Sequence, residues 1–411
     1  MTLRLGGLHH VTAVAANGQA NVVFYTGVLG LRLVKRTVNF AAPDTYHLYY
    51  GDAAGRPGTI LSFFLAPDRG QARQGSGQAI AVAFAAPPDS LAYWVDRLAQ
   101  FRVPFARSLT CVDEPALTFR DPDGLALDLV AADVPSQAGA AEHGPVPPEH
   151  AIRGLHSVTL ALEDPGATCR FLGDTLGCVE SGSNQHVRRF TCAGSGLGAA
   201  VYVAADSRGR GTIGAGAVHH VAFRARDTED HPAWRARLEA AGADPTDVID
   251  RVYFRSIYFH EPGGVRLEIT VDPPGFCIDE APHELGMNLR LPPWLESRRA
   301  ELEAVLPCLD VGHLRGAAWP LTDAATRALA DRAAVEVRLV ISNHVGTDAA
   351  GDLQDELPLG PLGLGLDSVG IVELLLACEE RFGFPFPPAL FDDGGLTVGR
   401  LIEYVRRVSR A

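Results

Sequence analysis

Hydrophobic and polar positions follow one repeated order between residues 8 and 272. An apolar strand is followed by an amphipathic helix and then by further strands, and this order occurs four times. Alternation of apolar and polar positions predicts the strands, and an apolar spacing of three to four predicts the helices. The leading strands are expected at 9–16, 79–87, 156–164 and 219–227, and the helices at 19–30, 90–101, 166–177 and 231–242. The sequence therefore predicts four βαβββ modules, the second pair repeating the first.

A single βαβββ module cannot cover its own sheet, so we expect the modules to pair. Paired modules form a curved sheet around a cleft, which is a natural place for a metal or a ligand. Beyond Asp272 the pattern changes, and one helix over 292–306 is predicted as a tail packed on the modules. From about Leu321 the pattern is helical, with helices expected at 323–345, 367–383 and 396–408.

Two histidine pairs and one glutamate recur in this frame. His9 and His10 open the first strand of module one, His219 and His220 open that of module four, and Glu268 lies on the last strand of module four. Two histidines and one carboxylate from three strands can form a facial triad that leaves positions open on a divalent metal. Because successive strand residues point to opposite faces, only one histidine of each pair can face the metal, and the parity does not say which.

Two further residues occupy corresponding positions in the other modules. His156 opens the third module, and Asp128 lies on the last strand of the second module. They could be remnants of a second metal site. Because the position that would supply the other histidine is apolar, near Ala81, a structural role is expected for both.

Several motifs agree in order and spacing with one family. LHHVT, YHLYYGD, GLHSVTL, AVHHVAF, YFRSIYFHEPGGVRLE and the tail LPPWLESRRAELEAVLP resemble ring-cleaving dioxygenases of the vicinal oxygen chelate superfamily, nearest to the hydroquinone-cleaving branch. The resemblance covers residues 5–305 and implies insertion of oxygen from O₂ and ring opening. It implies a site with Fe(II), or alternatively Mn(II), bound by His10, His220 and Glu268, and with the substrate surrounded by His9, Thr12, His219, Arg251 and Tyr258. Arg251 would hold negative charge, while Tyr258 and the additional histidines would pass protons.

Ser368 stands in LGLDSVG, directly before a predicted helix. Taken alone, a serine at this place is an ordinary helix N-cap. However, LGLDS, the helix that ends in EERFG, and FPPALFDDGGLTVGRLIEYV together resemble acyl and peptidyl carrier proteins over residues 325–411. This resemblance implies a helical bundle that carries 4′-phosphopantetheine on Ser368. It also implies a phosphopantetheinyl transferase and other biosynthetic enzymes as partners.

These expectations define an α+β chain of four parts. Residues 1–135 would form an N-terminal vicinal oxygen chelate domain of two modules, and residues 150–305 a second such domain with its tail. Residues 306–324 would be a linker, which contains Gly312, Gly316 and Pro320. Residues 325–411 would form an all-α carrier bundle.

Composition narrows the classes of function. The 411 residues are 47% hydrophobic and 21% charged, which argues against disorder. A net charge of −13 disfavours nonspecific nucleic-acid binding. No apolar stretch approaches the roughly 18 residues of a membrane span, and the N-terminus leads directly into a strand without a signal peptide. The seven cysteines are scattered, so we expect reduced thiols in a cytoplasmic protein.

The function favoured by the sequence is that of a non-haem Fe(II)-dependent oxygenase of the ring-cleaving type. It would act with O₂ on a phenolic or other metal-chelating substrate in natural-product biosynthesis, and the substrate would be free or tethered to the carrier domain. One alternative is a metal-dependent isomerase or lyase of the same fold, because fold does not determine chemistry. Another is a degenerate scaffold that only presents a carrier, although the intact ligand set argues against it. The sequence leaves the oligomeric state open.

Overall fold

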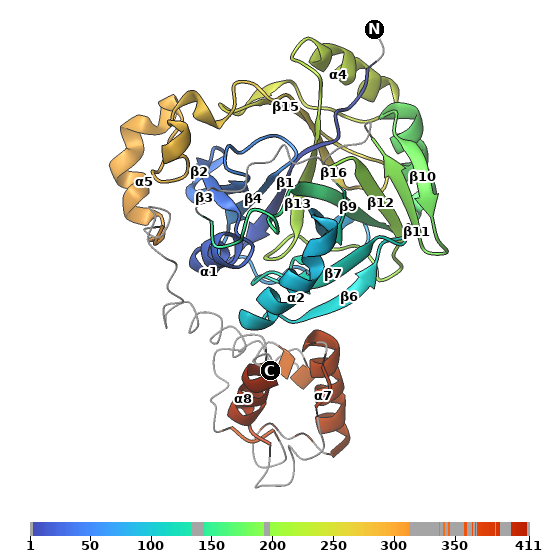
Figure 1. Ribbon diagram of the computed structural model, residues 1–411, viewed down its shortest axis with the longest axis vertical. Coiled ribbons are helices and arrows are strands. Elements are labelled where there is room, and N and C mark those ends of the chain that lie inside the picture. The colour runs from blue at the N-terminus through green and yellow to red at the C-terminus, as the bar shows by residue number, and fades with distance from the viewer. Residues whose placement is uncertain are drawn as a thin grey trace. The chain divides into compact units, whose positions relative to one another are not determined.

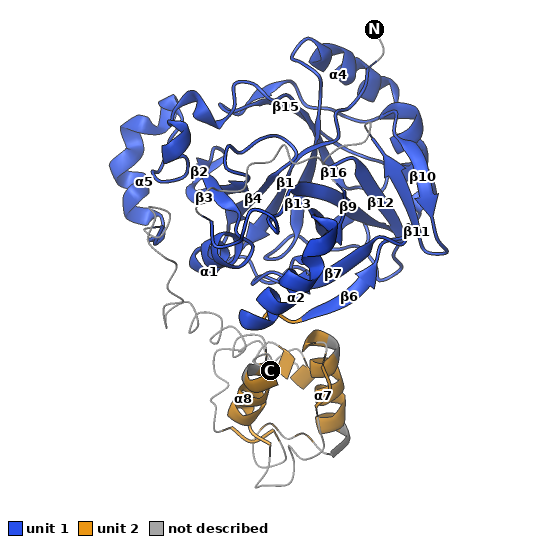
Figure 2. Cartoon of the chain, in the orientation of Figure 1, with its two compact units in different colours: residues 1–101, 105–319 blue, residues 102–104, 320–411 orange. Residues whose placement is uncertain are grey.

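The computed structural model describes residues 3–133, 144–192 and 198–311, and parts of 337–408. The chain divides into two compact units (Figure 2). Unit 1 comprises residues 1–101 and 105–319, and unit 2 comprises residues 102–104 and 320–411.

Unit 1 contains the four predicted βαβββ modules. The strands of modules one and two are β1 (Leu8–Ala15), β2 (Arg32–Asn39), β3 (Ala42–Gly51), β4 (Ile60–Leu65), β5 (Gln78–Ala86), β6 (Phe105–Leu109), β7 (Pro115–Arg120) and β8 (Ala126–Ala131). Those of modules three and four are β9 (Gly154–Leu162), β10 (Val179–Ser183), β11 (Val187–Thr191), β12 (Ala200–Ala205), β13 (Val218–Arg224), β14 (Ile249–Asp250), β15 (Arg255–His260) and β16 (Arg266–Thr270). The predicted fold class is confirmed.

Each module has one helical segment after its first strand. In modules one and three a short α-helix continues as a π-helix, and in module two a 3₁₀ turn leads into an α-helix. These segments are α1 (Gly18–Val22) with η1 (Val23–Val28), η2 (Pro88–Ser90) with α2 (Leu91–Gln100), α3 (Pro165–Arg170) with η3 (Phe171–Thr175), and α4 (Asp230–Ala240). The side chains of Asn17 and Asp164 cap α1 and α3 in the same way, by accepting a hydrogen bond from a backbone N–H of the first turn.

The modules pair as one with four and two with three. One eight-stranded sheet has the order β14-β15-β16-β13-β1-β4-β3-β2, and the other has the order β10-β11-β12-β9-β5-β8-β7-β6 (Figure 1). In each sheet the first strands of the two modules are antiparallel neighbours, β1 with β13 and β5 with β9. Each sheet therefore joins segments from both halves of the repeat, and this pairing brings the two histidine pairs onto adjacent strands.

A repeated turn fixes the register of the last two strands in modules two and four. The Glu261 carboxylate accepts hydrogen bonds from the backbone N–H groups of Gly263 and Val265 between β15 and β16. Asp121 accepts from the equivalent N–H groups between β7 and β8. The turn at Glu261 also needs a positive φ, which Gly264 adopts at 93°. As a result, Tyr258 stands directly opposite Glu268.

The tail after β16 packs back onto module one. It contains η4 (Phe276–Ile278), η5 (Pro282–Glu284), η6 (Pro293–Arg298) and α5 (Arg299–Val305). The helix predicted at 292–306 is α-helical only in its second half, and the half that follows Pro292 and Pro293 is a 3₁₀-helix. Lys35, the single lysine of the chain, is fully buried on β2 and binds the tail.

The contacts of Lys35 attach the tail to β2 of the first sheet. Its Nζ donates to the Phe276 carbonyl at 3.1 Å and to Asp279 Oδ1 at 2.6 Å, and it also pairs with Glu280. Phe276 belongs to a buried cluster with Tyr49, Tyr253 and Phe254. Phe254 in turn packs against the ring of His10, at a centroid distance of 5.1 Å. The tail thereby supports the residues around the predicted metal site.

Unit 2 contains the helices α7 (Ser368–Phe382) and α8 (Val398–Val408). They enclose a core that includes Leu374, Cys378, Leu401 and Val405. Of the helix predicted at 323–345, described positions from Val337 to Val345 are helical, and residues 323–336 lie outside the described residues. Ser368 is the first residue of α7, and its side chain also lies outside the description. In the described parts of the chain, the helices are too short or too polar to cross a lipid bilayer.

Two further features differ from the expectations. In module three the apolar pattern after the helix indicates strands only at 185–194 and 199–205, and β10 lies outside both, because its sequence VESGS is polar and mostly exposed at the edge of a sheet. Cys178 and Cys192 form a disulfide, although reduced thiols were expected. The antiparallel pairing explains this bond: Val179 lies opposite Thr191, so the two cysteines just outside these strand ends face each other.

Candidate metal centre and substrate pocket

Three strands of the first sheet bring His10, His220 and Glu268 together. His10 lies on β1, His220 on the adjacent β13, and Glu268 on β16, which pairs with β13. His10 Nε2 is 3.3 Å from His220 Nε2 and 3.4 Å from Glu268 Oε2. His220 Nε2 is 3.0 Å from the same oxygen, and all three residues are buried. The second histidine of each pair therefore points to the shared position.

The arrangement of these three atoms fits a metal ion. Both carboxylate oxygens of Glu268 are buried without a hydrogen-bond partner, although His220 Nε2 lies only 3.0 Å away. Two ligand atoms about 2.1 Å from an ion and at right angles to each other are about 3.0 Å apart. The observed separations approach that value on all three sides. Among the residues that the structure describes, no other three His, Cys, Asp or Glu side chains converge in this way.

The protonation states also suit metal binding. Burial alone would raise the pKa of Glu268, but its interactions with His10 and His220 outweigh burial and hold this pKa well below the usual value for glutamate. Burial lowers the pKa of His220 to about 4, despite an opposing effect of Glu268. Glu268 is therefore ionised and His220 is neutral at pH 7, which are the forms that bind metal ions.

The first histidine of each pair contacts the second. His9 Nδ1 lies 3.0 Å from His10 Nδ1, and His219 Nδ1 lies 2.8 Å from His220 Nδ1. His9 is buried, and its Nε2 is 4.0 Å from Asp272 Oδ1. His219 lines the pocket beside His220, where burial, followed by the charge of His220, lowers its pKa to about 3. The two pairs thus have matching internal geometry. Of the first histidines of the two pairs, His219 lines the pocket and His9 does not.

Arg251 and Tyr258 lie together in the same pocket. Tyr258 on β15 is the cross-strand neighbour of Glu268, so both side chains emerge on one face of the sheet. Arg251 Nε donates to the Tyr258 hydroxyl at 3.1 Å, and its guanidinium lies 5.0 Å from the centre of that ring. Burial and then the charge of Glu268 raise the pKa of Tyr258 well above its usual value. Tyr258 is therefore a protonated phenol at neutral pH.

Thr12 is connected to the pocket through hydrogen bonds but does not line it. Its Oγ1 is 2.8 Å from Ser62 Oγ, which is 3.0 Å from His47 Nε2, and His47 Nδ1 is 2.9 Å from the Tyr49 hydroxyl. His47 and Tyr49 line the pocket, whereas Thr12 is fully buried behind them. The sequence contains a signal for this series of hydrogen bonds, because His47 and Tyr49 are two residues apart on one strand and their side chains share a face. Neither was predicted as a site residue.

The cleft around the three converging side chains is a pocket of about 160 Å³. Modules one and four both contribute to it. Its described lining consists of His10, Asn39, Phe40, Ala41, His47, Tyr49, Phe64, His219, His220, Arg251, Phe254, Tyr258 and Arg266. Of the predicted residues around the substrate, His219, Arg251 and Tyr258 are in this lining, whereas His9 and Thr12 are not.

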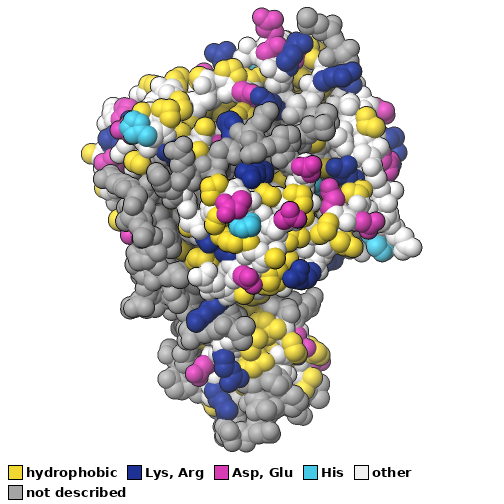
Figure 3. Space-filling model, in the orientation of Figure 1, with side chains coloured by type: hydrophobic (Ala, Val, Ile, Leu, Met, Phe, Trp, Pro, Cys, Tyr) yellow, Lys and Arg dark blue, Asp and Glu magenta, His cyan; other side chains and the backbone are white. Residues whose placement is uncertain are grey.

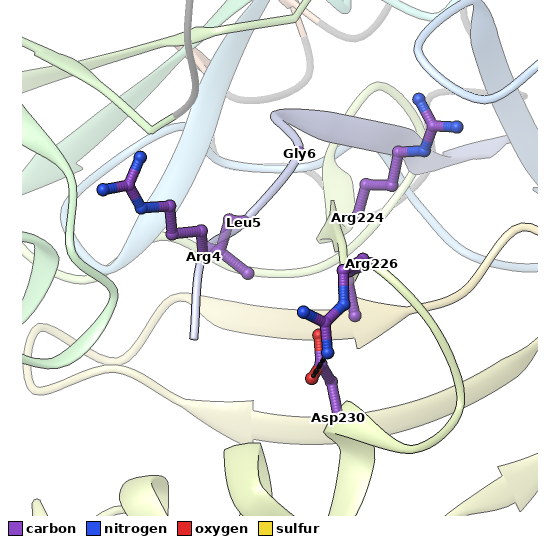
Figure 4. A pocket seen from close by; sticks show the side chains of 7 residues that line it. Arg4, Leu5, Gly6, Arg224, Arg226 and Asp230 are labelled. Carbon is purple, nitrogen blue, oxygen red and sulfur yellow. Dashed lines mark hydrogen bonds and ion pairs between the residues drawn. The ribbon is translucent and has the colours of Figure 1, made fainter. Parts of the chain in front are cut away.

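A larger pocket, of about 370 Å³, lies between the N-terminal segment and the start of α4 (Figure 4). Arg4, Arg224 and Arg226 line it. Arg224 pairs with Asp272 and Arg226 pairs with Asp230, so two of its three cations are already neutralised. None of the residues predicted to act in catalysis lies in its lining. His10, His219, His220, Arg251 and Tyr258 line the smaller pocket instead.

Among the described residues, the corresponding place in the second sheet holds no comparable group of three ligands. His156 Nε2 lies 3.5 Å from Glu114 Oε2, while Asp128 accepts a hydrogen bond of 2.6 Å from Thr118. Burial raises the pKa of Asp128. These contacts agree with the structural role that was expected for His156 and Asp128.

Comparison with known proteins gives the family. The profile described as "Glyoxalase/Bleomycin resistance protein/Dioxygenase superfamily" matches residues 7–129 and 154–269. The chain belongs to this superfamily. It is 39% identical over 314 residues to the "Putative ring-cleaving dioxygenase MhqO" of Bacillus subtilis, covering 76% of this chain and 100% of that protein. It is also 33% identical over 306 residues to the chlorohydroquinone/hydroquinone 1,2-dioxygenase of Sphingobium indicum, covering 73% of this chain and 95% of that protein.

A solved structure supports the glyoxalase-superfamily fold. A crystal structure of a "putative dioxygenase" from Bacillus subtilis matches with a TM-score of 0.73 and 39% identity, and the match covers 75% of this chain and 99% of that one. At the C-terminus, the profile of the phosphopantetheine attachment site matches residues 362–405. The predicted family, the predicted enzyme class of a metal-dependent dioxygenase and the predicted carrier domain are confirmed.

Proposed function

We propose that the chain is a non-haem Fe(II)-dependent ring-cleaving dioxygenase for hydroquinone-type substrates. The observation that carries this proposal is the triangle of His10 Nε2, His220 Nε2 and Glu268 Oε2, with sides of 3.0–3.4 Å. Two imidazoles and one carboxylate on one face of an ion are typical of Fe(II) oxygenases, with Mn(II) as the alternative metal. The Sphingobium relative is named for chlorohydroquinone and hydroquinone, which favours this substrate class.

The bound ion would supply open coordination positions at which a phenolate and O₂ meet. The residues of the chain provide the remaining functions. Arg251 offers positive charge to an anionic oxygen of the substrate. Tyr258, whose hydroxyl already accepts from Arg251, is a protonated donor within the same pocket. His219 is a neutral imidazole in the lining that can exchange a proton with the substrate.

The pocket restricts the size of the substrate. Its volume of about 160 Å³ is below the roughly 300–1,000 Å³ typical of pockets for drug-sized ligands. Phe40, Phe64 and Phe254 supply flat apolar walls around the polar groups. A single substituted aromatic ring suits these dimensions and this lining.

The phosphopantetheine attachment domain supports a role for this reaction in natural-product biosynthesis. We propose that a phosphopantetheinyl transferase attaches 4′-phosphopantetheine to Ser368, the first residue of α7. The arm would present an acyl or aminoacyl intermediate of a natural product either to the dioxygenase or to neighbouring biosynthetic enzymes. A tether raises the local substrate concentration into the millimolar range for short flexible linkers, so a weakly bound substrate would still react.

Oxygen uptake tests the proposed reaction. The Fe(II)-loaded full-length protein is supplied with hydroquinone under ¹⁸O₂, and the products are analysed by mass spectrometry. We expect metal-dependent O₂ consumption and a ring-opened product that contains ¹⁸O. A metal-dependent product without ¹⁸O would instead indicate an isomerase or lyase reaction.

A further inference from the structure

Arg266 is a second cation in the substrate pocket, beside Arg251. It lies on β16, two residues before Glu268, so both side chains emerge on the same face of the strand. Its guanidinium carbon is 4.9 Å from the centre of the Tyr258 ring, close to the corresponding distance of 5.0 Å for Arg251. Among the described residues, no acidic side chain forms an ion pair with either arginine.

The charge of this pocket exceeds what one phenolate would balance. The described lining includes two arginines and no carboxylate. Glu268, which is buried beside the pocket-lining His10 and His220, would neutralise only one of the two charges of a divalent ion. With such an ion bound, the net charge would be +3, and a substrate coordinated as a single phenolate would leave an excess of two positive charges. A pocket of this kind favours a ligand with a second anionic group.

We propose that Arg266 binds a carboxylate substituent of the aromatic diol, so that the preferred substrate is a free hydroquinone carboxylic acid. This inference rests on the proposed function and specifies its substrate class. Guanidinium groups match carboxylates with two parallel N–H···O hydrogen bonds.

The position of Arg266 on the strand supports this assignment. Residues two apart on one strand are separated by about 6.6 Å along its axis. The backbone of Arg266 therefore lies one pleat from that of Glu268, a spacing comparable with the width of a substituted benzene ring, and its guanidinium lies over the Tyr258 ring. A ring whose hydroxyl oxygen is near Glu268 can thus reach Arg266 with a substituent on its far side.

The free acid and the thioester of the same carboxyl group would then behave differently. A thioester on the carrier arm has no negative charge at this carboxyl, so Arg266 would have nothing to neutralise. The pocket would select the free acid, or a tethered substrate that retains another carboxylate.

Anaerobic calorimetry on the Fe(II)-loaded full-length protein tests the inference without turnover. The probes are hydroquinone, 2,5-dihydroxyphenylacetate and its methyl ester, which serves as a neutral analogue of a thioester. We expect the acid to bind roughly 10- to 100-fold more tightly than the ester, as for hydrogen bonds to charged groups. In Arg266→Gln, the ratio of the two dissociation constants should fall towards one. The matched control Arg255→Gln changes an exposed arginine on β15 that pairs with Asp250 and is absent from the pocket lining, so it should keep the wild-type ratio.

Two results would overturn the inference. Equal binding of acid and ester to the wild type would show that the pocket does not select a carboxylate. A preference that survives in Arg266→Gln would mean that the metal or Arg251 binds the carboxylate. Failure of the proposed function would look different, because no diol would then support O₂ uptake, whatever its binding order.

Discussion

The Nδ1 atoms of His219 and His220 lie 2.8 Å apart. A neutral histidine that binds a metal through Nε2 carries its proton on Nδ1, and an outer partner usually accepts that proton. Here the acceptor would be His219 Nδ1, so His219 would carry its own proton on Nε2. This tautomer makes His219 a hydrogen-bond donor in the pocket. The same relationship links His9 to His10, whose Nδ1 atoms are 3.0 Å apart, but His9 is buried and does not line the pocket.

Replacing His9 tests this outer contact separately from substrate binding, because His9 is not in the described pocket lining. His9→Ala removes the partner of His10 Nδ1, and we expect metal affinity to fall by about 10- to 100-fold. Competition with a chelator measures this change. His156→Ala, which alters the histidine in the first strand of the third module, should leave the affinity unchanged. Unaltered affinity in His9→Ala would show that the contact does not support the ligand.

Arg251 and Tyr258 are expected to affect turnover more than metal binding. Arg251→Ala removes a positive charge from the pocket, and Tyr258→Phe removes its buried phenol donor. Each variant should retain its metal and lose roughly 10²-fold in turnover, the scale of one positioned proton donor or charge stabiliser. Steady-state O₂ uptake and metal content, measured on the same samples, separate the two effects. Wild-type turnover in both variants would make these residues structural.

Lys35 is expected to be important for stability. Lys35→Met leaves Asp279 and Glu280 without their buried cation, and loss of one partner from a buried ion pair costs roughly 3–5 kcal/mol. Urea unfolding followed by tryptophan fluorescence measures the free energy of unfolding. Arg298→Met, which breaks an exposed pair with Glu301, provides a control that should remain close to wild type. Equal stability of the two variants would contradict the role of Lys35 as an anchor.

The carrier assignment predicts one modification at a single serine. A phosphopantetheinyl transferase with coenzyme A should add one phosphopantetheine mass to the wild type and none to Ser368→Ala. Intact-protein mass spectrometry distinguishes these states. If Ser368→Ala is modified as well, the attachment residue is wrong. If free substrate reacts equally well in Ser368→Ala, the tether serves a neighbouring enzyme rather than this reaction.

The order of strands and helices in the modules could be predicted from the sequence, because apolar positions recur every second residue in strands and every three to four residues in helices. Strand β10 was missed because it is a polar edge strand with little apolar alternation. The pairing of module one with module four depends on contacts distant in sequence, which periodicity does not encode. The convergence of His10 and His220 follows from that pairing, so their matching repeat positions were an indirect signal of it.

The remaining pocket residues show what local patterns leave out. His47 and Tyr49 share a strand face, and Arg266 shares one with Glu268, so parity was a usable signal for both sets. Parity could not show which face of the strand lines the pocket, because that depends on the curvature of the sheet. The distribution of charge is a second property that the sequence did not predict. Acidic and basic side chains of unit 1 are interspersed on the face shown in Figure 3, and the net charge alone does not reveal this arrangement.

Metal content per chain tests the central claim most directly. The wild type and the variants His10→Ala, His220→Ala and Glu268→Gln are loaded with Fe(II), desalted and analysed by plasma mass spectrometry. Asp128→Asn is the matched control, because Asp128 occupies the position of Glu268 in the second module. We expect about one ion per chain in the wild type and in Asp128→Asn, and a large loss in the other three, since each loses one of three facial ligands. Full occupancy in all three variants would contradict the proposed metal centre.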